Sequence, residues 1–247
     1  MYPSLNIGPF ALPTAALVIL IGIWVCLWLA ERTARRLDLD VQAMSALVTW
    51  GLVAGFVGAR LTFVGLYWSA YQDNLLGIIW PINSGYNWLG GLFFGAAAMF
   101  FYGRYKQLPP APYLDALAPV FVTGLAFVSL ADFLGGSGFG TNTNLPWGIN
   151  SYGIRRHPVQ LYEIGTALLA LAAWSYFEKR QPFEGQLFLI TTAVYSFGRL
   201  LVDPFRATTW ITSGGWHGMQ IICLLATLAA LLLLMRSTPD KAPAAGG

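Results

Sequence analysis

Charged residues are scarce in this chain. Asp, Glu, Lys and Arg together make up 10% of its 247 residues, whereas hydrophobic residues make up 56%. A soluble domain carries charge on about a quarter of its residues, so this deficit excludes an ordinary soluble fold. The mean hydropathy of +0.58 agrees with an integral membrane protein. Aromatic residues, at 15%, are typical of the Trp and Tyr belts at membrane interfaces.

Cysteine and histidine are also nearly absent. Cys26 and Cys223 each lie inside an apolar run, where thiols are usually buried and inert. Two such residues support neither a disulfide framework nor a thiolate metal site. His157 and His217 are too few for a histidine metal cluster. We therefore expect no metal, no cofactor and no nucleic-acid partner.

Seven apolar runs are long enough, at about 20 residues, to cross the hydrocarbon core of a bilayer. They lie at about 9–30, 41–68, 85–102, 113–134, 157–177, 186–205 and 215–235. The third is short, and residues 75–80 before it suit a position along the interface. We predict an all-α integral membrane protein with one seven-helix domain over residues 1–235. Residues 236–247, rich in Pro, Ala and Gly, are predicted to form a disordered tail.

Basic residues predict the orientation, because cytoplasmic loops are enriched in Lys and Arg. With the N-terminus outside, nine basic residues fall in inner segments, and only Arg155, Arg156 and Arg206 fall in outer ones. The C-terminus is then cytoplasmic, and residues 135–156 face outward.

Small residues recur along the second and third apolar runs. They are Gly51, Gly55, Gly58, Ala59, Gly90, Gly91 and Gly95. Such residues let helix backbones approach closely in lipid, so we interpret them as sites of close helix packing.

Ionisable residues inside the predicted spans are functional candidates, because charge is costly in lipid. Tyr195, Arg199, Asp203 and Arg206 are spaced by four, four and three residues and share one helical stripe. In one interpretation Arg199 and Asp203 simply neutralise each other. In the other, Arg199 and Arg60 bind an anionic group while Asp203 orients them, since a guanidinium suits phosphate. For Arg206 the alternative is that it lies at the membrane interface and has no role in the site.

The longest polar stretch, residues 135–163, opens with four glycines and leads into a helix that begins near His157 and Pro158. Glycines allow close approach of the backbone to a ligand, and proline is common in a first helical turn. His157 is a candidate general base or, equally, an interfacial histidine with satisfied hydrogen bonds.

Gln160 and Glu163 follow on one face of that helix, three residues apart. A glutamate inside a membrane needs a cationic partner, and Arg199 or Arg60 is the expected one. Asp132 comes late in the fourth span, just before the glycines.

Several motifs carry a resemblance to the prolipoprotein diacylglyceryl transferase family. In chain order they are GARL (58–61), GGL (90–92), LDALAP (114–119), DFLGGSGFG (132–140), LPWG (145–148), RHPVQLYE (156–163) and YSFGRLLVDPFR (195–206). The resemblance implies the same seven-span fold in the bacterial plasma (inner) membrane. It also implies an enzyme that transfers the diacylglyceryl group of phosphatidylglycerol to the cysteine thiol of a lipoprotein precursor.

The residue patterns and the resemblance together give the site candidates. Candidate catalytic residues are Tyr195, Arg199, Asp203 and His157, and candidate lipid-binding residues are Arg60, Arg199, Gln160, Tyr162, Glu163, Gly140 and Arg206. The resemblance implies that Arg60 and Arg199 contact the phospholipid headgroup and that Tyr195 and Asp203 belong to the catalytic neighbourhood. Gly140 would close the signature loop.

The chain departs from the family's pattern at several signature positions. Leu89 stands in place of a His and Ser129 in place of an Arg, while Asp132 replaces Asn or Cys, Ser137 replaces Glu or Cys, and Asp203 replaces Glu. Thiol transfer requires a base that forms the thiolate and cations that stabilise the departing glycerol phosphate. These departures therefore bear on catalysis.

Two hypotheses remain open. The chain is either a divergent, lipid-modifying transferase that binds phospholipid in a helix-lined cavity, or a non-catalytic paralogue that serves as an accessory subunit of a larger membrane complex. A third hypothesis, a transporter or channel, lacks the internal repeat that many transporters have.

Overall fold

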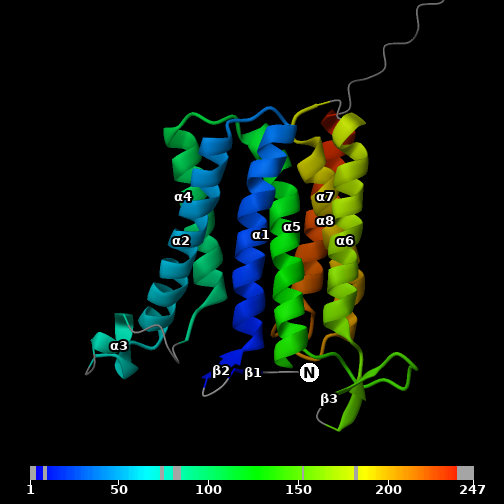
Figure 1. The fold of residues 1–247 in the computed structure, drawn as a ribbon. Coiled ribbons are helices and arrows are strands. Elements are labelled where there is room, and N and C mark those ends of the chain that lie inside the picture. Colours follow the sequence, from blue (N-terminus) through cyan, green and yellow to red (C-terminus); the bar gives the residue numbers. More distant parts are fainter. Residues whose placement is uncertain are drawn as a thin grey trace, which may run out of the picture. The chain divides into compact units, whose positions relative to one another are not determined.

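The computed structural model describes residues 4–7, 10–72, 75–79, 85–151, 153–180 and 183–237. Long helices make up most of this part of the chain (Figure 1). The helices are α1 (Thr14–Arg36), α2 (Val41–Leu66), α3 (Leu76–Ile79), α4 (Trp88–Tyr105), α5 (Pro110–Gly135), α6 (Val159–Phe177), α7 (Gln186–Val202) and α8 (Gly218–Ser237). The antiparallel strands β1 (Ser4–Ile7) and β2 (Phe10–Pro13) form one hairpin, and β3 (Ile149–Ser151) and β4 (Ile154–Arg156) form another. Short 3-10 helices are η1 (Trp68–Ala70), η2 (Glu178–Arg180) and η3 (Asp203–Phe205).

The chain divides into two compact units, which are described separately. Unit 1 contains Met1–Leu29 and Leu114–Gly247, and unit 2 contains Ala30–Tyr113. The single membrane domain over residues 1–235 stays a prediction. The predicted disordered tail lies, from residue 238 onward, outside the described residues.

Five helices in the described part of the chain are long and apolar enough to cross a membrane. They are α1, α2, α5, α7 extended through η3, and α8. A helical, multi-pass membrane protein is therefore confirmed. Helices α4 and α6 occupy the other two predicted runs but are not among these five; α4 contains four glycines and Arg104, and α6 contains Gln160 and Glu163. Seven spans and their orientation stay predictions.

The first helix begins later than the predicted run. Residues 10–13 form β2, and α1 starts at Thr14. Pro13 explains the difference, because a proline inside a helix removes a backbone donor and clashes with the preceding turn. In the same way, Pro158 precedes α6 as its N-cap, and the helix starts at Val159.

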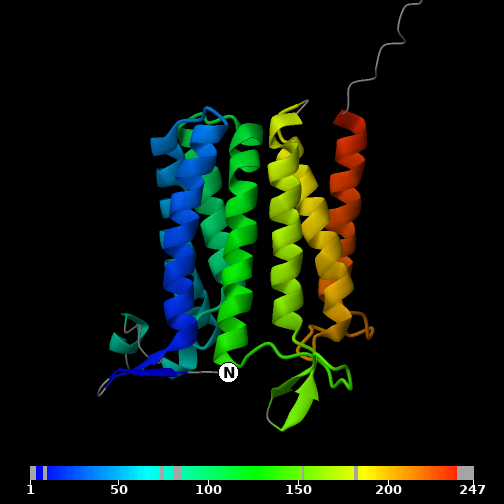
Figure 2. The ribbon, with the colours of Figure 1, turned by 45° about the vertical axis from the view of Figure 1, so that its right-hand side comes forward.

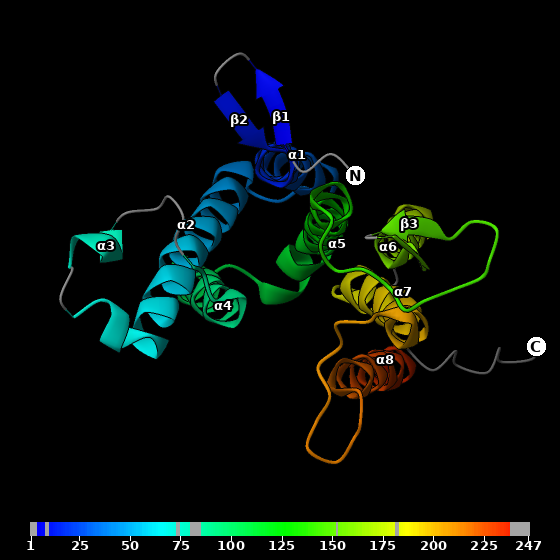
Figure 3. The same ribbon diagram turned by 90° about the horizontal axis from the view of Figure 1, so that it is seen from below.

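In unit 2, α2 and α4 lie side by side and pack through glycines (Figure 3). A Cβ atom on Gly95 would lie 2.9 Å from the carbonyl oxygen of Gly51, and one on Gly91 would lie 3.1 Å from that of Gly55. Larger side chains would push the two backbones apart. Close helix packing at the small residues is confirmed, and the structure identifies α2 and α4 as the partners.

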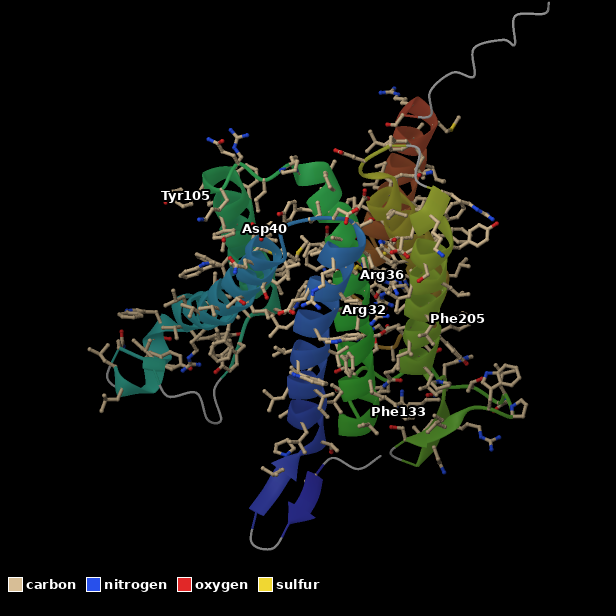
Figure 4. The ribbon with its side chains drawn as sticks, turned by 45° about the horizontal axis from the view of Figure 1, so that its top comes forward. Arg32, Arg36, Asp40, Tyr105, Phe133 and Phe205 are labelled. Atoms are coloured by element: carbon tan, nitrogen blue, oxygen red, sulfur yellow. The ribbon has the colours of Figure 1, made fainter. Side chains whose placement is uncertain are left out.

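The turn between α1 and α2 is fixed by Asp40. Its carboxylate accepts hydrogen bonds of 2.8 and 3.1 Å from two N–H groups in the first turn of α2, which otherwise lack partners. Arg32 and Arg36, near the end of α1, lie at the same end of unit 2 as Asp40 and as Tyr105, where α4 ends (Figure 4). Basic side chains there complement the carboxyl end of the α1 dipole.

In unit 1, α1 contacts α5, and α6, α7 and α8 lie side by side (Figure 2). The Cys26 thiol donates to the carbonyl of Val120 at 3.5 Å, and the hydroxyls of Ser196 and Thr227 join α7 to α8 at 2.8 Å. The carboxyl ends of α5 and α7 and the amino ends of α6 and α8 lie at one end of the unit (Figure 2). Polar residues from four helices can therefore meet there.

Asp115 caps α7 from the neighbouring helix α5. Its carboxylate is fully buried and accepts hydrogen bonds from the backbone N–H groups of Gly185, at 2.6 Å, and Phe188, at 2.7 Å. The Trp174 indole donates to the Asp115 carbonyl at 2.8 Å. Backbone donors at a helix start must find partners within a membrane. Asp115 therefore has a structural role, at the end of unit 1 where α7 begins.

Candidate functional site

Glu163, near the start of α6, is the centre of a charged cluster in unit 1. Its Oε1 atom forms ion pairs with Arg199 Nη1 of α7, at 2.8 Å, and with Nη1 of Arg206, which follows η3. Its Oε2 atom accepts a hydrogen bond of 2.7 Å from Ser129 Oγ of α5. The Glu163 side chain is 6% exposed, so these partners replace water. The expected cationic partner is confirmed as Arg199, with Arg206 as a second one.

Arg206 also contacts a second carboxylate. Its Nη2 atom lies 3.8 Å from Asp132 Oδ2. Ser137 Oγ donates to Asp132 Oδ1 at 2.7 Å, and Gln160 Nε2 donates to the Ser137 carbonyl at 2.7 Å. These bonds tie the glycine-rich loop to the first turn of α6. Arg206 therefore belongs to the charged cluster and does more than mark the interface.

Asp203, the first residue of η3, joins the cluster to a histidine. Its Oδ1 atom lies 3.8 Å from Arg199 Nη2, and its Oδ2 atom lies 3.4 Å from His217 Nδ1. The Asp203 side chain is 1% exposed and that of His217 is 34% exposed. Sequence reasoning did not assign His217 to the site. The loop between the two residues is irregular, so no helical spacing relates them.

Two buried atoms of this cluster make no hydrogen bond with any described residue. They are Arg199 Nη1 and Asp203 Oδ1. Arg199 Nη1 is close enough to Glu163 for an ion pair, but the two groups lack hydrogen-bond geometry. Unsatisfied polar atoms are costly when buried. Among the described residues, no group of three or more His, Cys, Asp and Glu side chains is placed to hold a metal ion.

Gly140 lets the glycine-rich loop approach the segment after α7. The backbone of residues 139–141 bonds to that of residues 205–207, with N–H···O distances of 2.8 and 3.2 Å. A Cβ atom on Gly140 would lie 2.4 Å from the carbonyl oxygen of His157. A side chain is therefore excluded at this position. The structure places Gly140 as a steric requirement of the loop.

His157 lies in an aromatic group beside this loop. Its Nδ1 atom is 3.4 Å from the Tyr162 hydroxyl, to which the Trp147 indole donates at 2.8 Å. Its ring centroid is 4.8 Å from that of Phe205, which Figure 4 labels. Among the described residues, His157 forms no ion pair with the cluster carboxylates. Its role as a base and the role of Tyr162 in lipid binding stay predictions.

Tyr195, one turn before Arg199 on α7, packs against an apolar group. That group consists of Val122, Ala167 and Ala170 from α5 and α6. Tyr195 thus packs α7 against α5 and α6, one turn before Arg199. Its assignment to the catalytic neighbourhood stays a prediction.

Arg60, on α2 of unit 2, is surrounded by backbone carbonyls. Its guanidinium donates to Gly77, to Ile78 at 3.0 Å and to Gly85 at 3.0 Å, and it lies over the Tyr71 ring at 5.2 Å. The residue is 8% exposed. These contacts join α2 to α3 and to Gly85, just before α4. A role of Arg60 in headgroup binding stays a prediction.

Comparison with known sequences identifies the family of the chain. The model of a family described as prolipoprotein diacylglyceryl transferase matches residues 3–236. The chain belongs to this family. The phosphatidylglycerol–prolipoprotein diacylglyceryl transferase of Enterococcus faecalis is 30% identical over 234 residues, which cover 89% of this chain and 84% of that protein. The enzymes of the same name from Thermosynechococcus vestitus and Synechococcus elongatus are 27% and 28% identical and cover 90% and 95% of this chain.

The structure also places the residues that are predicted to depart from the family's pattern. Ser129, predicted to stand in place of an Arg, presents a neutral hydroxyl to Glu163. Asp132 and Ser137 bond to each other beside Arg206. Leu89, predicted to stand in place of a His, is 56% exposed on α4 of unit 2. The cluster therefore contains two guanidinium groups and three carboxylates, so that its arginines are neutralised by the protein itself.

Proposed function

We propose that this protein is a diacylglyceryl transferase that uses phosphatidylglycerol, with its headgroup site at the Glu163 cluster. Arg199 Nη1 carries the proposal, because it is a buried cationic donor without a hydrogen bond among the described residues. A phosphate oxygen suits such a donor, since the guanidinium fork matches phosphate geometry. Membership of the transferase family supports the same substrate class.

The headgroup phosphate competes with Glu163 for the same cations. Three carboxylates already lie beside the two guanidinium groups. A further anion is therefore repelled unless one carboxylate releases the arginine with which it is paired. Glu163 is shared between Arg199 and Arg206, and Ser129 holds its second oxygen. In the proposed complex the phosphate takes over Arg199, while Arg206 and Ser129 retain Glu163. The neutralised cluster is thus the resting state.

The proposed reaction joins the precursor's cysteine sulfur to the diacylglyceryl carbon of the lipid. The thiol gives its proton to a base and the C–S bond forms. The C–O bond to the headgroup phosphate breaks, and its electron pair stays on the oxygen of the departing glycerol phosphate. Arg199 stabilises the charge that develops on that oxygen. Asp203, one turn further along, holds the guanidinium in position.

The proposed function includes seven spans with the N-terminus outside, an arrangement in which this cluster lies at the outer face of the bacterial plasma membrane. The positive-inside distribution of Lys and Arg supports this orientation. Labelling of single cysteines introduced at Ser213 and Lys179 tests it in intact cells. Only the first is expected to react with a membrane-impermeant maleimide.

A second candidate function rests on Ser129 and Leu89. A chain without the signature Arg and His, and with its remaining arginines neutralised, suits a paralogue that binds phospholipid without transferring it. Such a protein would serve as an accessory subunit of a larger membrane complex.

One experiment separates the two functions. The gene is expressed in cells depleted of their own transferase, and the purified protein is incubated in phosphatidylglycerol vesicles with a lipoprotein-precursor peptide. We expect growth to be rescued and the peptide to gain the mass of a diacylglyceryl group. Arg199→Ala removes both, whereas Arg180→Ala, which changes an exposed arginine over the Tyr176 ring, removes neither.

The opposite result favours the second function. Absence of rescue and of peptide modification, with phosphatidylglycerol still bound and the chain purified in a stable assembly, would exclude the transferase. Equal activity of the Arg199→Ala variant and the wild-type protein would show that the headgroup site lies elsewhere.

A further inference from the structure

We propose that His217 is the base that accepts the thiol proton, and that Asp203 orients it. This inference rests on the proposed transferase function and names a residue that neither the motifs nor the family resemblance assign. The observation behind it is the 3.4 Å contact between His217 Nδ1 and Asp203 Oδ2.

The two members of this pair have the unequal burial that such a role requires. Asp203 is 1% exposed, whereas the His217 side chain is 34% exposed. The carboxylate thus holds the Nδ1 edge of the ring from inside the protein, while the side chain as a whole is partly exposed. In the tautomer with Nδ1–H directed at Asp203, Nε2 is the acceptor. A buried carboxylate fixes the tautomer of a catalytic histidine in this way and stabilises the imidazolium that forms.

The pair is joined to the proposed headgroup site through one carboxylate. Asp203 contacts His217 with Oδ2 and approaches Arg199 Nη2 with Oδ1, at 3.8 Å. The base and the cation for the leaving group therefore share a neighbour. Asp203 Oδ1 makes no hydrogen bond among the described residues, so the Arg199 guanidinium balances this buried carboxylate only from 3.8 Å. Proton transfer to His217 places a second positive charge beside Asp203, at Oδ2.

The alternatives for a base in this chain are few. Leu89 has no acid–base chemistry, and the sequence contains two histidines. His157 is held by the Tyr162 hydroxyl and the Phe205 ring. His217 is the histidine that contacts a carboxylate of the charged cluster.

The proposed step is balanced in atoms and electrons. The thiol proton moves to His217 Nε2, and the sulfur electron pair forms the C–S bond to the diacylglyceryl carbon. The C–O bond breaks towards the phosphate oxygen, and glycerol phosphate departs next to Arg199. The imidazolium then releases its proton to the leaving phosphate or to water, which restores the neutral base.

The test compares His217→Asn with the wild-type protein in the vesicle assay. The asparagine amide can still donate to Asp203, but it has no basic nitrogen. We expect kcat to fall about 100-fold or more, in the range of general-base catalysis, while phosphatidylglycerol binding stays within twofold. Imidazole added to His217→Ala is expected to restore part of the rate. Ser213→Ala, at an exposed position of the same loop, is the matched control and keeps wild-type activity.

The possible results separate this inference from the proposed function. If the rate of His217→Asn is less than threefold below the wild-type rate, His217 is not the base, and the proposed transferase function is unaffected. A larger loss in His157→Asn than in His217→Asn would assign the base to His157. If the wild-type protein transfers nothing, both proposals fail. Loss of lipid binding in both His217 variants, with no rescue by imidazole, would show that the residue is structural.

Discussion

Replacing Glu163 by Gln gives the sharpest test of the charged cluster. The amide keeps the size of the side chain and one acceptor oxygen but removes the negative charge. Arg199 and Arg206 then lose the carboxylate that they share. The substitution should therefore destabilise unit 1 and, at the same time, free a guanidinium for an external anion.

The geometry sets the size of the effect. At 2.8 Å, one ion pair has a Coulomb energy of about 6 kcal/mol at an effective dielectric constant of about 20. Desolvation offsets much of this, and the side chains of Arg199 and Arg206 are 13% and 19% exposed. We expect the free energy of unfolding to fall by about 3 kcal/mol, at the low end of the range for breaking a buried pair. Affinity for phosphatidylglycerol should rise on the order of tenfold, because one repelling charge is gone.

The assay is reversible unfolding in mixed detergent micelles, followed by circular dichroism, with lipid binding measured in parallel. Glu184→Gln is the matched control, since it makes the same change at an exposed glutamate of unit 1 and should cost less than about 0.5 kcal/mol. If Glu163→Gln and Glu184→Gln unfold alike, the cluster does not hold unit 1 together. If stability falls but lipid affinity does not rise, the competition between Glu163 and phosphate is refuted.

Three further predictions concern the framework of the protein. Asp115→Asn leaves one N–H group at the start of α7 without an acceptor and should cost about 2 kcal/mol in the same unfolding assay; a loss below about 0.5 kcal/mol would contradict the capping role. Gly95→Ala places a Cβ against a backbone oxygen and should cost about 1–3 kcal/mol, whereas Gly65→Ala, where a Cβ would meet open space, should be neutral or slightly stabilising. Arg60→Met removes the side-chain donor from the carbonyls of Gly77, Ile78 and Gly85 and should increase proteolysis between α2 and α4; proteolysis at the wild-type rate, together with lost lipid binding, would favour the headgroup role instead.

Much of the fold was predictable because it follows from local patterns. Apolar runs of sufficient length indicated the seven long helices of the described residues, and five of these meet the requirement for crossing a membrane. The small residues indicated close helix packing, and the structure shows it between α2 and α4, at Gly51 and Gly95. Pro13 and Pro158 also explain why two helices start later than the predicted runs, because each helix begins directly after its proline. The hairpin of β3 and β4 was not predicted, because its three-residue strands lie within a polar loop.

The site was predictable only in part. The spacing along the sixth run grouped Arg199 with Asp203, and the cost of charge in lipid predicted a cationic partner for Glu163. The contacts of Ser129 and His217 could not be foreseen, because they join residues from separate elements. Arg60 illustrates the opposite case, since its charge suggested a ligand and its neighbours turned out to be backbone carbonyls.

The sequence by itself determined the class of the protein, the positions of its long helices and its family, because hydropathy, helix punctuation and motif order are properties of the chain alone. The tertiary structure decided which charges meet. Glu163 pairs with Arg199 and Arg206, and Asp203 turns towards His217, because α6, α7 and α8 place their polar ends at one end of unit 1. The order of helices across a bundle depends on side-chain packing between distant segments, which the periodicity of a single helix does not encode.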